Sequence, residues 1–236
     1  MKSGKIILGL AVALLLPLSF YLVAKLLHKD RIYLPAYYLP DGCDSIMVDG
    51  KFVCDTVYHQ LNDITLYNQL GEKVSLNQDL SGKILVVNFF FTGCATTCPK
   101  LMSNMAMLQK AFRDDPKKEF KVSQTIQFLS ISVTPEIDSP AVLRAYAERY
   151  NANHDKWWLL TGDKSSIYQY ARKELGLITG SGEGGMDDFI HSDRVVLIDS
   201  SRYVRGYYDG LDAIALKKCA EDAVLLTMEK KRKKKK

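Results

Sequence analysis

The sequence ILVVNFFFTGCATTCPKLM, from Ile84 to Met102, decides the fold class. It opens with a near-continuous run of β-branched and aromatic residues, which is typical of a strand buried on both faces. Gly93 breaks this run, and Pro99 suits the first turn of a helix because it lacks an N–H and has a fixed φ. Apolar residues then recur at spacings of three and four as far as Phe112, as on one face of a helix. The stretch therefore predicts a strand that runs directly into a helix.

Two cysteines lie at this junction, Cys94 in the turn and Cys98 at the helix N-terminus. The free N–H groups and the dipole of a helix start favour a thiolate, the form that attacks disulfides and binds soft metals. A spacing of four can bring both sulfurs to one side of the turn. Isolated cysteines often pack as small hydrophobic residues, but this pair is closer to the C-x-x-C of thioredoxin-like proteins. Redox chemistry and metal binding are both open, and the extra residue in C-x-x-x-C indicates a relative of thioredoxin with a different task.

The rest of the chain alternates predicted strands with predicted helices. A hairpin at 64–66 and 74–76 precedes the Ile84 strand, and a second strand covers 126–133. Helices are expected at 140–150, with Ser139 as N-cap, and at 165–175, followed by a hairpin at 195–198 and 203–207 and a last helix at 212–228. This order predicts an α/β, thioredoxin-like fold.

The composition indicates one globular domain with attachments. The chain has 236 residues, of which 47% are hydrophobic and 25% charged. Its formal charge of +5 comes from seven consecutive basic residues, Lys230 to Lys236; without them 25 basic residues face 27 acidic ones. The folded body therefore gives no electrostatic sign of a nucleic-acid partner. The basic tail is expected to be a solvated end, with contact to anionic lipid headgroups as the alternative.

The N-terminus predicts a membrane anchor. The segment from Ile6 to Leu27 is almost wholly apolar, and about 20 apolar residues are enough to span a bilayer. A cleaved signal peptide is the competing interpretation, but no clear A-x-A cleavage site follows Pro17. We expect an uncleaved anchor in a bacterial inner membrane, with the domain facing the periplasm or an equivalent oxidising compartment.

Four regions follow from these patterns: an anchor at 1–30, a linker at 31–57, a thioredoxin-like domain at 58–229 and the tail at 230–236. Within the linker, Cys43 and Cys54 lie on two short predicted strands around an Asp49-Gly50 turn signal, so antiparallel pairing could bring them together. A structural disulfide between them requires an oxidising compartment. Cys219, on the last helix, is expected to pack in the core.

His191 is the histidine best placed for a site, because it comes just before the strand at 195–198. A lone histidine in a loop is usually only solvated, but in a thioredoxin-like sheet this one could face both sulfurs. The glycine-rich stretch Gly180 to Gly185 lacks the Lys-Ser/Thr of a phosphate-binding loop and the strand-to-helix context. It is expected to be a mobile loop that could move His191.

Three segments together resemble the Sco/SenC family of membrane-anchored, thioredoxin-like copper proteins: FFFTGCATTCPKL, the stretch from Ser132 to Pro140, and FIHSDRVVLID from Phe189 to Asp199. The resemblance covers roughly Tyr58 to Lys230. It implies that Cys94, Cys98 and His191 bind one copper ion, and that the protein assembles the dinuclear copper site of a cytochrome c oxidase, with the copper-receiving subunit as its partner.

The resemblance also assigns a supporting role to Asp138, which matches the second acidic residue of the family's D-P-x-x-D-T-P stretch. The chain departs from that stretch at Thr134, which replaces the first Asp, and at Ser139, which replaces Thr. The ligand set is unaffected.

The donor chemistry agrees with copper. Thiolates select Cu(I), and an imidazole suits copper in either oxidation state. Zinc is the rival metal, but a structural zinc site usually has four protein ligands and no fourth is evident. The alternative function is a thiol-disulfide oxidoreductase in which an exposed Cys94 attacks and Cys98 resolves. A peroxidase-like role has less support, because no Thr or Arg constellation around Cys94 suggests peroxide activation.

Overall fold

The computed structural model describes residues 13–23, 34–48, 51–112, 124–177 and 193–234. The chain divides into two units, Met1–Tyr33 and Leu34–Lys236. In the first unit residues 13–23 are helical, and the remainder of the predicted anchor lies outside the described residues. Among the helices that are described, none is both long and apolar enough to cross a membrane.

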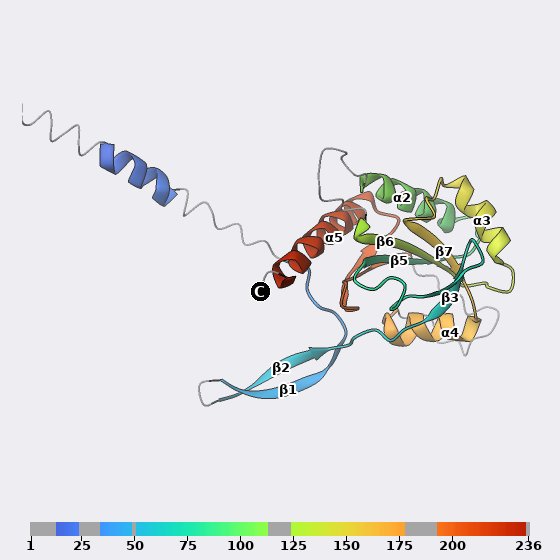
Figure 1. The fold of residues 1–236 in the computed structure, drawn as a ribbon, viewed down its shortest axis with the longest axis horizontal. Coiled ribbons are helices and arrows are strands. Elements are labelled where there is room, and N and C mark those ends of the chain that lie inside the picture. The colour runs from blue at the N-terminus through green and yellow to red at the C-terminus, as the bar shows by residue number, and fades with distance from the viewer. Residues whose placement is uncertain (1–12, 24–33, 49–50, 113–123, 178–192, 235–236) are drawn as a thin grey trace, which may run out of the picture. The chain divides into compact units, whose positions relative to one another are not determined.

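The second unit is built on a seven-stranded sheet in the order β4-β3-β7-β6-β5-β8-β9 (Figure 1). The strands β5, β6 and β7 are parallel, and the strands outside them pair antiparallel. The strand bounds are Thr65–Asn68 for β3, Lys73–Ser75 for β4, Ile84–Phe90 for β5, Ile126–Ser132 for β6, Trp157–Thr161 for β7, Arg194–Ile198 for β8 and Val204–Asp209 for β9.

Helices cover both faces of this sheet (Figure 1). One face carries α2, α3 and α5, and the other carries α4 and the π-helical turn η2. Their bounds are Thr97–Ala111 for α2, Pro140–Arg149 for α3, Lys164–Gln169 for α4, Tyr170–Glu174 for η2 and Ala213–Lys234 for α5. The α/β, thioredoxin-like arrangement expected from the alternating pattern is therefore present.

The strand β5 lies at the centre of the sheet and is buried along its whole length, as its apolar run predicts. Ile84, Val86 and Phe90 pack towards α2, α3 and α5. Leu85, Val87 and Phe89, at the alternate positions of the strand, pack towards α4 and η2. A strand with helices on both sides needs apolar residues at every position, which is why its sequence does not alternate.

Two elements differ from the sequence prediction. The sequence pattern does not predict the strand β7, because four apolar residues after a polar loop do not by themselves distinguish a strand from a buried helical segment. The expected helix at 165–175 is instead a short α-helix followed by the π-helical turn η2. Gly176 follows them with φ of +60°, a left-handed conformation suited to glycine. The predicted N-cap is confirmed, since Ser139 accepts a hydrogen bond from the Val142 N–H.

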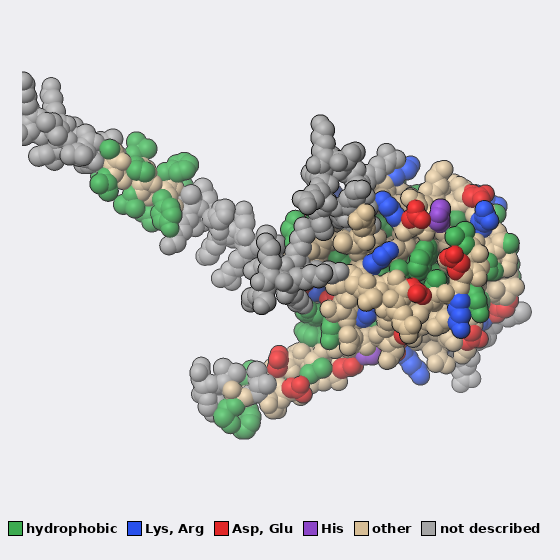
Figure 2. All heavy atoms as spheres, in the orientation of Figure 1, with side chains coloured by type: hydrophobic (Ala, Val, Ile, Leu, Met, Phe, Trp, Pro, Cys, Tyr) green, Lys and Arg blue, Asp and Glu red, His purple; other side chains and the backbone are tan. Residues whose placement is uncertain are grey.

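A two-stranded hairpin, β1 (Pro40–Val48) and β2 (Lys51–Tyr58), precedes the sheet. It extends away from the sheet in Figure 1, and Figure 2 shows hydrophobic and acidic side chains along it. His59 fixes its base: Nδ1 lies 3.0 Å from Asp41 Oδ2, and Nε2 lies 2.9 Å from Glu174 Oε2 on η2. The hairpin is therefore tied to the helical layer beneath the sheet.

His59 should make stability depend on pH. Burial disfavours its charged form, but the hydrogen bonds to Glu174 and Asp41 outweigh this and raise its pKa above the ordinary 6.5. A raised pKa gives stability that is fully present below the unfolded value and is lost as the pH rises through the folded value. We expect His59→Gln to destabilise the protein at pH about 5.5 and to have little effect at pH about 9.

Urea unfolding of both proteins at the two pH values measures this difference. His154→Gln is the matched control, because the His154 side chain is largely exposed and, among the described residues, its ring pairs only with the neighbouring Asp155. An effect of His59→Gln that grows with rising pH would contradict the ion-pair interpretation.

Candidate metal and thiol site

The two cysteines lie in the connection between β5 and α2. The helix begins at Thr97, so Cys98 is within its first turn, and Cys94 precedes it in the turn. The Cys98 N–H donates a hydrogen bond to Cys94 Sγ at 3.3 Å. Both thiols are free, and their residues are only 9% and 7% exposed. The fold thus brings both cysteines to one buried turn, although Cys94 is less exposed than the sequence interpretation assumed.

The two thiols differ in acidity. Burial opposes ionisation of Cys94, but hydrogen bonds from Cys98 and from the backbone of Thr96 and Thr97 lower its pKa to about 7 from 9.0. Burial raises the pKa of Cys98 to about 12, and the Cys94 sulfur and the Asp193 carboxylate add to this rise. The helix N-terminus therefore favours the thiolate at Cys94, not at Cys98 as the sequence suggested, because its N–H groups point at the Cys94 sulfur.

Asp138 is hydrogen-bonded to the start of the turn that carries Cys94. Its side chain is wholly buried. Its carboxylate accepts hydrogen bonds from the Thr92 N–H and hydroxyl, at 3.2 and 2.5 Å, and from the Ser132 hydroxyl at 2.5 Å. The Thr134 hydroxyl donates a fourth, at 3.1 Å. Thr92 is two residues before Cys94, so this carboxylate holds the start of the thiol-bearing turn against the end of β6.

The structure explains why a threonine at position 134 is compatible with Asp138, although the family's stretch has an aspartate there. Thr134 is buried, and its hydroxyl donates to Asp138. An aspartate at this position would place a second carboxylate beside the first, and two buried like charges in contact are unfavourable. In this chain the Thr134 hydroxyl therefore donates a hydrogen bond to Asp138, where an aspartate would repel it.

His191 lies outside the described residues, as does the glycine-rich stretch from Gly180 to Gly185. The structure resumes at Asp193. The Gly210 N–H donates to the Asp193 carbonyl at 2.7 Å, and Asn104 Nδ2 of α2 donates to the Gly210 carbonyl at 2.8 Å. The chain two residues after His191 is therefore tied, through Gly210, to the helix that carries Cys98.

Gly210 is required for this contact. A Cβ there would lie 2.3 Å from Leu101 Cδ1 and 2.7 Å from the Asp193 carbonyl oxygen. Only a residue without a side chain allows such close approach. No sequence pattern indicates Asn104 or Gly210, because their roles depend on residues that are distant along the chain.

Tyr146, on α3, is a further neighbour of the thiols. It is buried, and its ring stacks on Phe90 with centroids 5.4 Å apart. Burial raises its pKa, and hydrogen bonding to Tyr150 and the charges of Cys98 and Cys94 contribute. The Tyr146 hydroxyl is therefore part of the electrostatic environment of the thiols.

Within the described part of the chain, no three His, Cys, Asp or Glu side chains gather into a metal site. Cys94 and Cys98 supply two soft donors, and a third would have to come from elsewhere. Two thiol sulfurs suit Cu(I) better than hard cations such as Mg²⁺. The residues present thus fit a soft metal, provided that the ligand set is completed.

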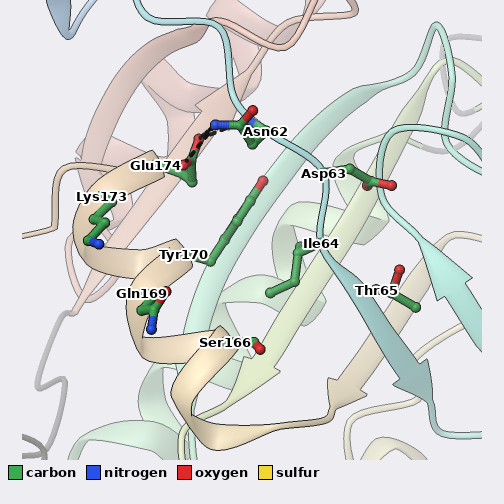
Figure 3. Close-up of a pocket in the computed structure, with 9 residues that line it drawn as sticks. All are labelled: Asn62, Asp63, Ile64, Thr65, Ser166, Gln169, Tyr170, Lys173 and Glu174. Carbon is green, nitrogen blue, oxygen red and sulfur yellow. Dashed lines mark hydrogen bonds between the residues drawn. The ribbon is translucent and has the colours of Figure 1, made fainter.

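A separate hollow of about 350 Å³ lies between α4–η2 and the segment from Asn62 to Thr65 (Figure 3). Tyr170 lines it and is buried, and its hydroxyl has no hydrogen-bond partner among the described residues. Glu174, at the rim, accepts hydrogen bonds from the Asn62 backbone and side chain. The helices of this hollow cover the face of the sheet opposite α2, so it is distinct from the thiol turn.

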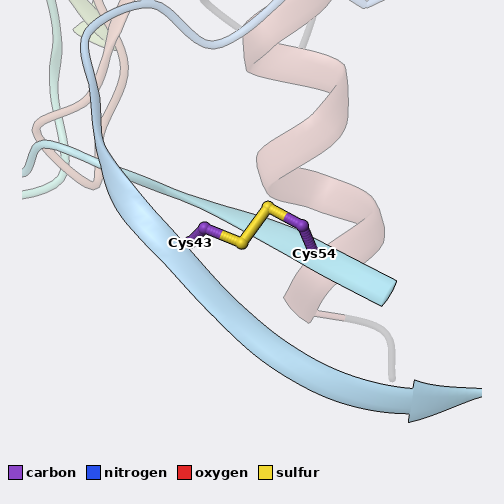
Figure 4. Close-up of a disulfide and its surroundings, with 2 residues drawn as sticks. All are labelled: Cys43 and Cys54. Carbon is purple, nitrogen blue, oxygen red and sulfur yellow. A yellow bond between two sulfur atoms is a disulfide. The ribbon is translucent and has the colours of Figure 1, made fainter. Parts of the chain in front are cut away.

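The structure joins Cys43 to Cys54 by a disulfide (Figure 4), with their Cα atoms 5.5 Å apart. The register of the hairpin places Ser45 opposite Cys54 and Cys43 opposite Thr56. The disulfide therefore links diagonal neighbours on one face of the hairpin. Cys219 is fully buried on α5, in keeping with the expected packing role.

Comparison with known proteins gives a consistent result. The model of the SCO1/SenC family matches residues 58–222. A SCO1 protein homolog of Bacillus subtilis is 31% identical over 69% of this chain and 80% of its own length. The structure of a SCO1/SenC family lipoprotein from Bacillus anthracis is 30% identical, with a TM-score of 0.61 over 71% of this chain and 95% of that one.

Two further structures are informative. BsSco, described as having a disulfide switch and as a member of the Sco family of cytochrome c oxidase assembly proteins, is 29% identical, with a TM-score of 0.60 over 72% of this chain and 94% of that one. Copper-bound ScoI of Bradyrhizobium japonicum is 20% identical, with a TM-score of 0.54 over 72% of this chain and 99% of that one. The last likeness is one of fold alone.

Asp138 should be essential to the stability of this site. Asp138→Ala leaves the donors from Thr92, Ser132 and Thr134 buried without an acceptor, so we expect the free energy of unfolding to fall by about 3 kcal/mol. Denaturant unfolding measures the change. Asp155→Ala, at an exposed position, should cost less than about 0.5 kcal/mol. Equal effects of the two substitutions would contradict the role given to Asp138.

Cys94 should be the thiol that reacts first. In the reduced, metal-free protein its pKa of about 7 means that the rate of alkylation by iodoacetamide rises through neutral pH and levels off above it, whereas Cys98 reacts only at much higher pH. Mass spectrometry of the modified peptide after brief labelling distinguishes the two positions. Preferential labelling of Cys98 at neutral pH would contradict this order.

Proposed function

The chain belongs to the SCO1/SenC family, and from this premise we propose that it is a copper-binding assembly factor for the copper site of a cytochrome c oxidase. The observation that carries the proposal is the buried pair Cys94 and Cys98, held in one turn with a hydrogen bond between them. The description of BsSco as a cytochrome c oxidase assembly protein supports the class of target.

We propose Cys94, Cys98 and His191 as the copper ligands. Asp193, two residues after His191, raises the pKa of Cys98 and so lies within electrostatic range of it. Two residues of extended chain span at most about 7 Å, which supports a histidine within reach of the sulfurs. Two thiolates and an imidazole give a site suited to copper, and three protein ligands leave room for a donor from the receiving protein.

The copper is cargo in this proposal. Thr92 and Asp138 hold the turn in place, and the hydrogen bonds to Cys94 keep its sulfur available as a thiolate near neutral pH. Cys98 needs the metal to displace its proton, because burial disfavours its free thiolate. The receiving subunit of the oxidase would take the metal by ligand exchange at the open side.

A location outside the cytoplasm fits this role. The apolar segment from Ile6 to Leu27 and the Cys43–Cys54 disulfide support a membrane-anchored domain in an oxidising space such as the bacterial periplasm. The Bacillus anthracis relative is described as a lipoprotein, which is a different means of attachment to a membrane.

The unequal acidity of the two thiols favours a second candidate function, thiol-disulfide exchange. The Cys94 thiolate would attack one sulfur of a target disulfide and release the other as a thiolate. Deprotonated Cys98 would then attack Cys94, which releases the reduced target and leaves a Cys94–Cys98 disulfide. The same two sulfurs cannot hold copper in that state, so the two functions exclude one another in time.

Copper counting tests the primary proposal. The reduced protein should bind one Cu(I), and Cys94→Ser, Cys98→Ser and His191→Ala should each weaken binding by more than about 100-fold, beyond the effect of losing an outer hydrogen-bonding partner. Competition with a colorimetric Cu(I) chelator measures the affinity. His154→Ala is the matched control and should bind as the wild type does. Undiminished affinity in His191→Ala would refute the three-ligand site.

The same variants separate the two functions. Disulfide reduction in the presence of a copper chelator should be lost in Cys94→Ser and retained in His191→Ala if the protein is an oxidoreductase. Stoichiometric copper binding without any disulfide reduction would support the assembly role and rule out the oxidoreductase.

A further inference from the structure

The hairpin β1–β2 lies outside the residues that the SCO1/SenC model matches, which begin at 58. An isolated two-stranded hairpin is at best marginally stable in water. Here the Cys43–Cys54 disulfide cross-links the strands, and His59 ties Asp41 at its base to Glu174. The disulfide and the ion pairs of His59 constrain the hairpin, and none of its described side chains belongs to either core cluster of the sheet.

The outer half of this hairpin exposes apolar side chains. Met47 and Phe52 are directly opposite each other in the register and are 65% and 76% exposed. Val53, on the other face, is 46% exposed. Single exposed apolar side chains scattered over a surface are normal, but a group of large ones at the end of a projecting element is typical of an interaction surface.

Negative charge lies on the opposite face of the hairpin, three positions from Met47 and Phe52 along the two strands. Asp44 and Asp55 are directly opposite each other on the face that carries Val53, and like charges at such positions are destabilising. No cationic side chain among the described residues pairs with either. From Asp44 to Asp55, the outer half of the hairpin, the sequence has three aspartates and one lysine, a net charge of −2. The surface is therefore complementary to a cationic one.

We propose that the outer half of the hairpin, with Met47 and Phe52 as apolar anchors and Asp44 and Asp55 as a carboxylate pair, is a docking surface for the copper-receiving protein. Because these two pairs lie on opposite faces of the hairpin, that protein would enclose the hairpin, with an apolar pocket against Met47 and Phe52 and an Arg or Lys side chain against the two carboxylates. The identity of the partner rests on the proposed function. The surface itself rests on the exposure, the register and the charge.

Charge decides against the other occupants. A second copy of the hairpin would bring two negatively charged elements together, and a membrane rich in anionic lipids would repel the carboxylates of Asp44 and Asp55. A cationic protein surface neutralises both aspartates, and burial of the aromatic ring supplies an anchor of the kind that dominates interfaces.

Binding of the full-length, Cu(I)-loaded chain in detergent micelles to the purified copper-site domain of the oxidase subunit tests the proposal. Phe52→Ser should raise the Kd about tenfold. The double variant Asp44→Asn/Asp55→Asn should raise it about tenfold at low salt and should reduce its dependence on salt. The matched controls are Ile214→Ser, at a position 80% exposed on α5, and Glu148→Gln on α3. Both should leave the Kd within about twofold.

Two measurements accompany each variant: copper per chain, and the mass of the Cys43–Cys54 peptide pair, which shows that the hairpin is still cross-linked. Wild-type affinity in Phe52→Ser would overturn the inference, and so would the absence of any binding by the wild type. Phe52-dependent flotation with phosphatidylglycerol vesicles, or Phe52-dependent self-association, would also overturn it. A chain that docks through Phe52 but holds no copper would refute the proposed function and leave this surface in place.

Discussion

The Asp138 carboxylate lies wholly buried between the ends of the two central strands, and the geometry of the thiol turn depends on it. It accepts hydrogen bonds from Thr92, Ser132 and Thr134. A buried carboxylate without such donors would be very costly, so the donors and the acceptor fix one another's positions. The turn that leaves β5 is thereby held to β6, and Cys94 starts from a defined place.

The acidity of the two cysteines follows from this placement. The helix begins where its N–H groups meet the Cys94 sulfur, whereas the Cys98 sulfur is desolvated by burial and lies within electrostatic range of Asp193. One thiol is prepared as a thiolate and the other is kept protonated until a metal or a disulfide replaces its proton. This arrangement suits both proposed functions, copper binding and thiol exchange, and under that proposal the oxidation state of the pair selects between them.

The sheet topology explains why a distant part of the chain meets this turn. β8 pairs with β5 and β9 pairs with β8, so the end of β9 lies beside α2. Gly210 lies there in contact with Leu101 and Asp193. The hairpin β1–β2 takes no part in the sheet. It is an addition to the family's domain, with its own cross-link and its own apolar and acidic surface.

The sequence by itself determined the buried central strand, the cysteine motif at its end, the Ser139 cap and the order of most elements, because local periodicity and turn residues encode these directly. Its resemblance to a family named the candidate ligands. Only the tertiary structure decided which thiol is acidic, what Asp138 binds, that β7 completes the middle of the sheet and that the 165–175 helix ends in a π-turn. Those properties depend on desolvation and on hydrogen bonds between residues far apart in sequence, such as Thr92 with Asp138 and Asn104 with Gly210, which no local pattern records.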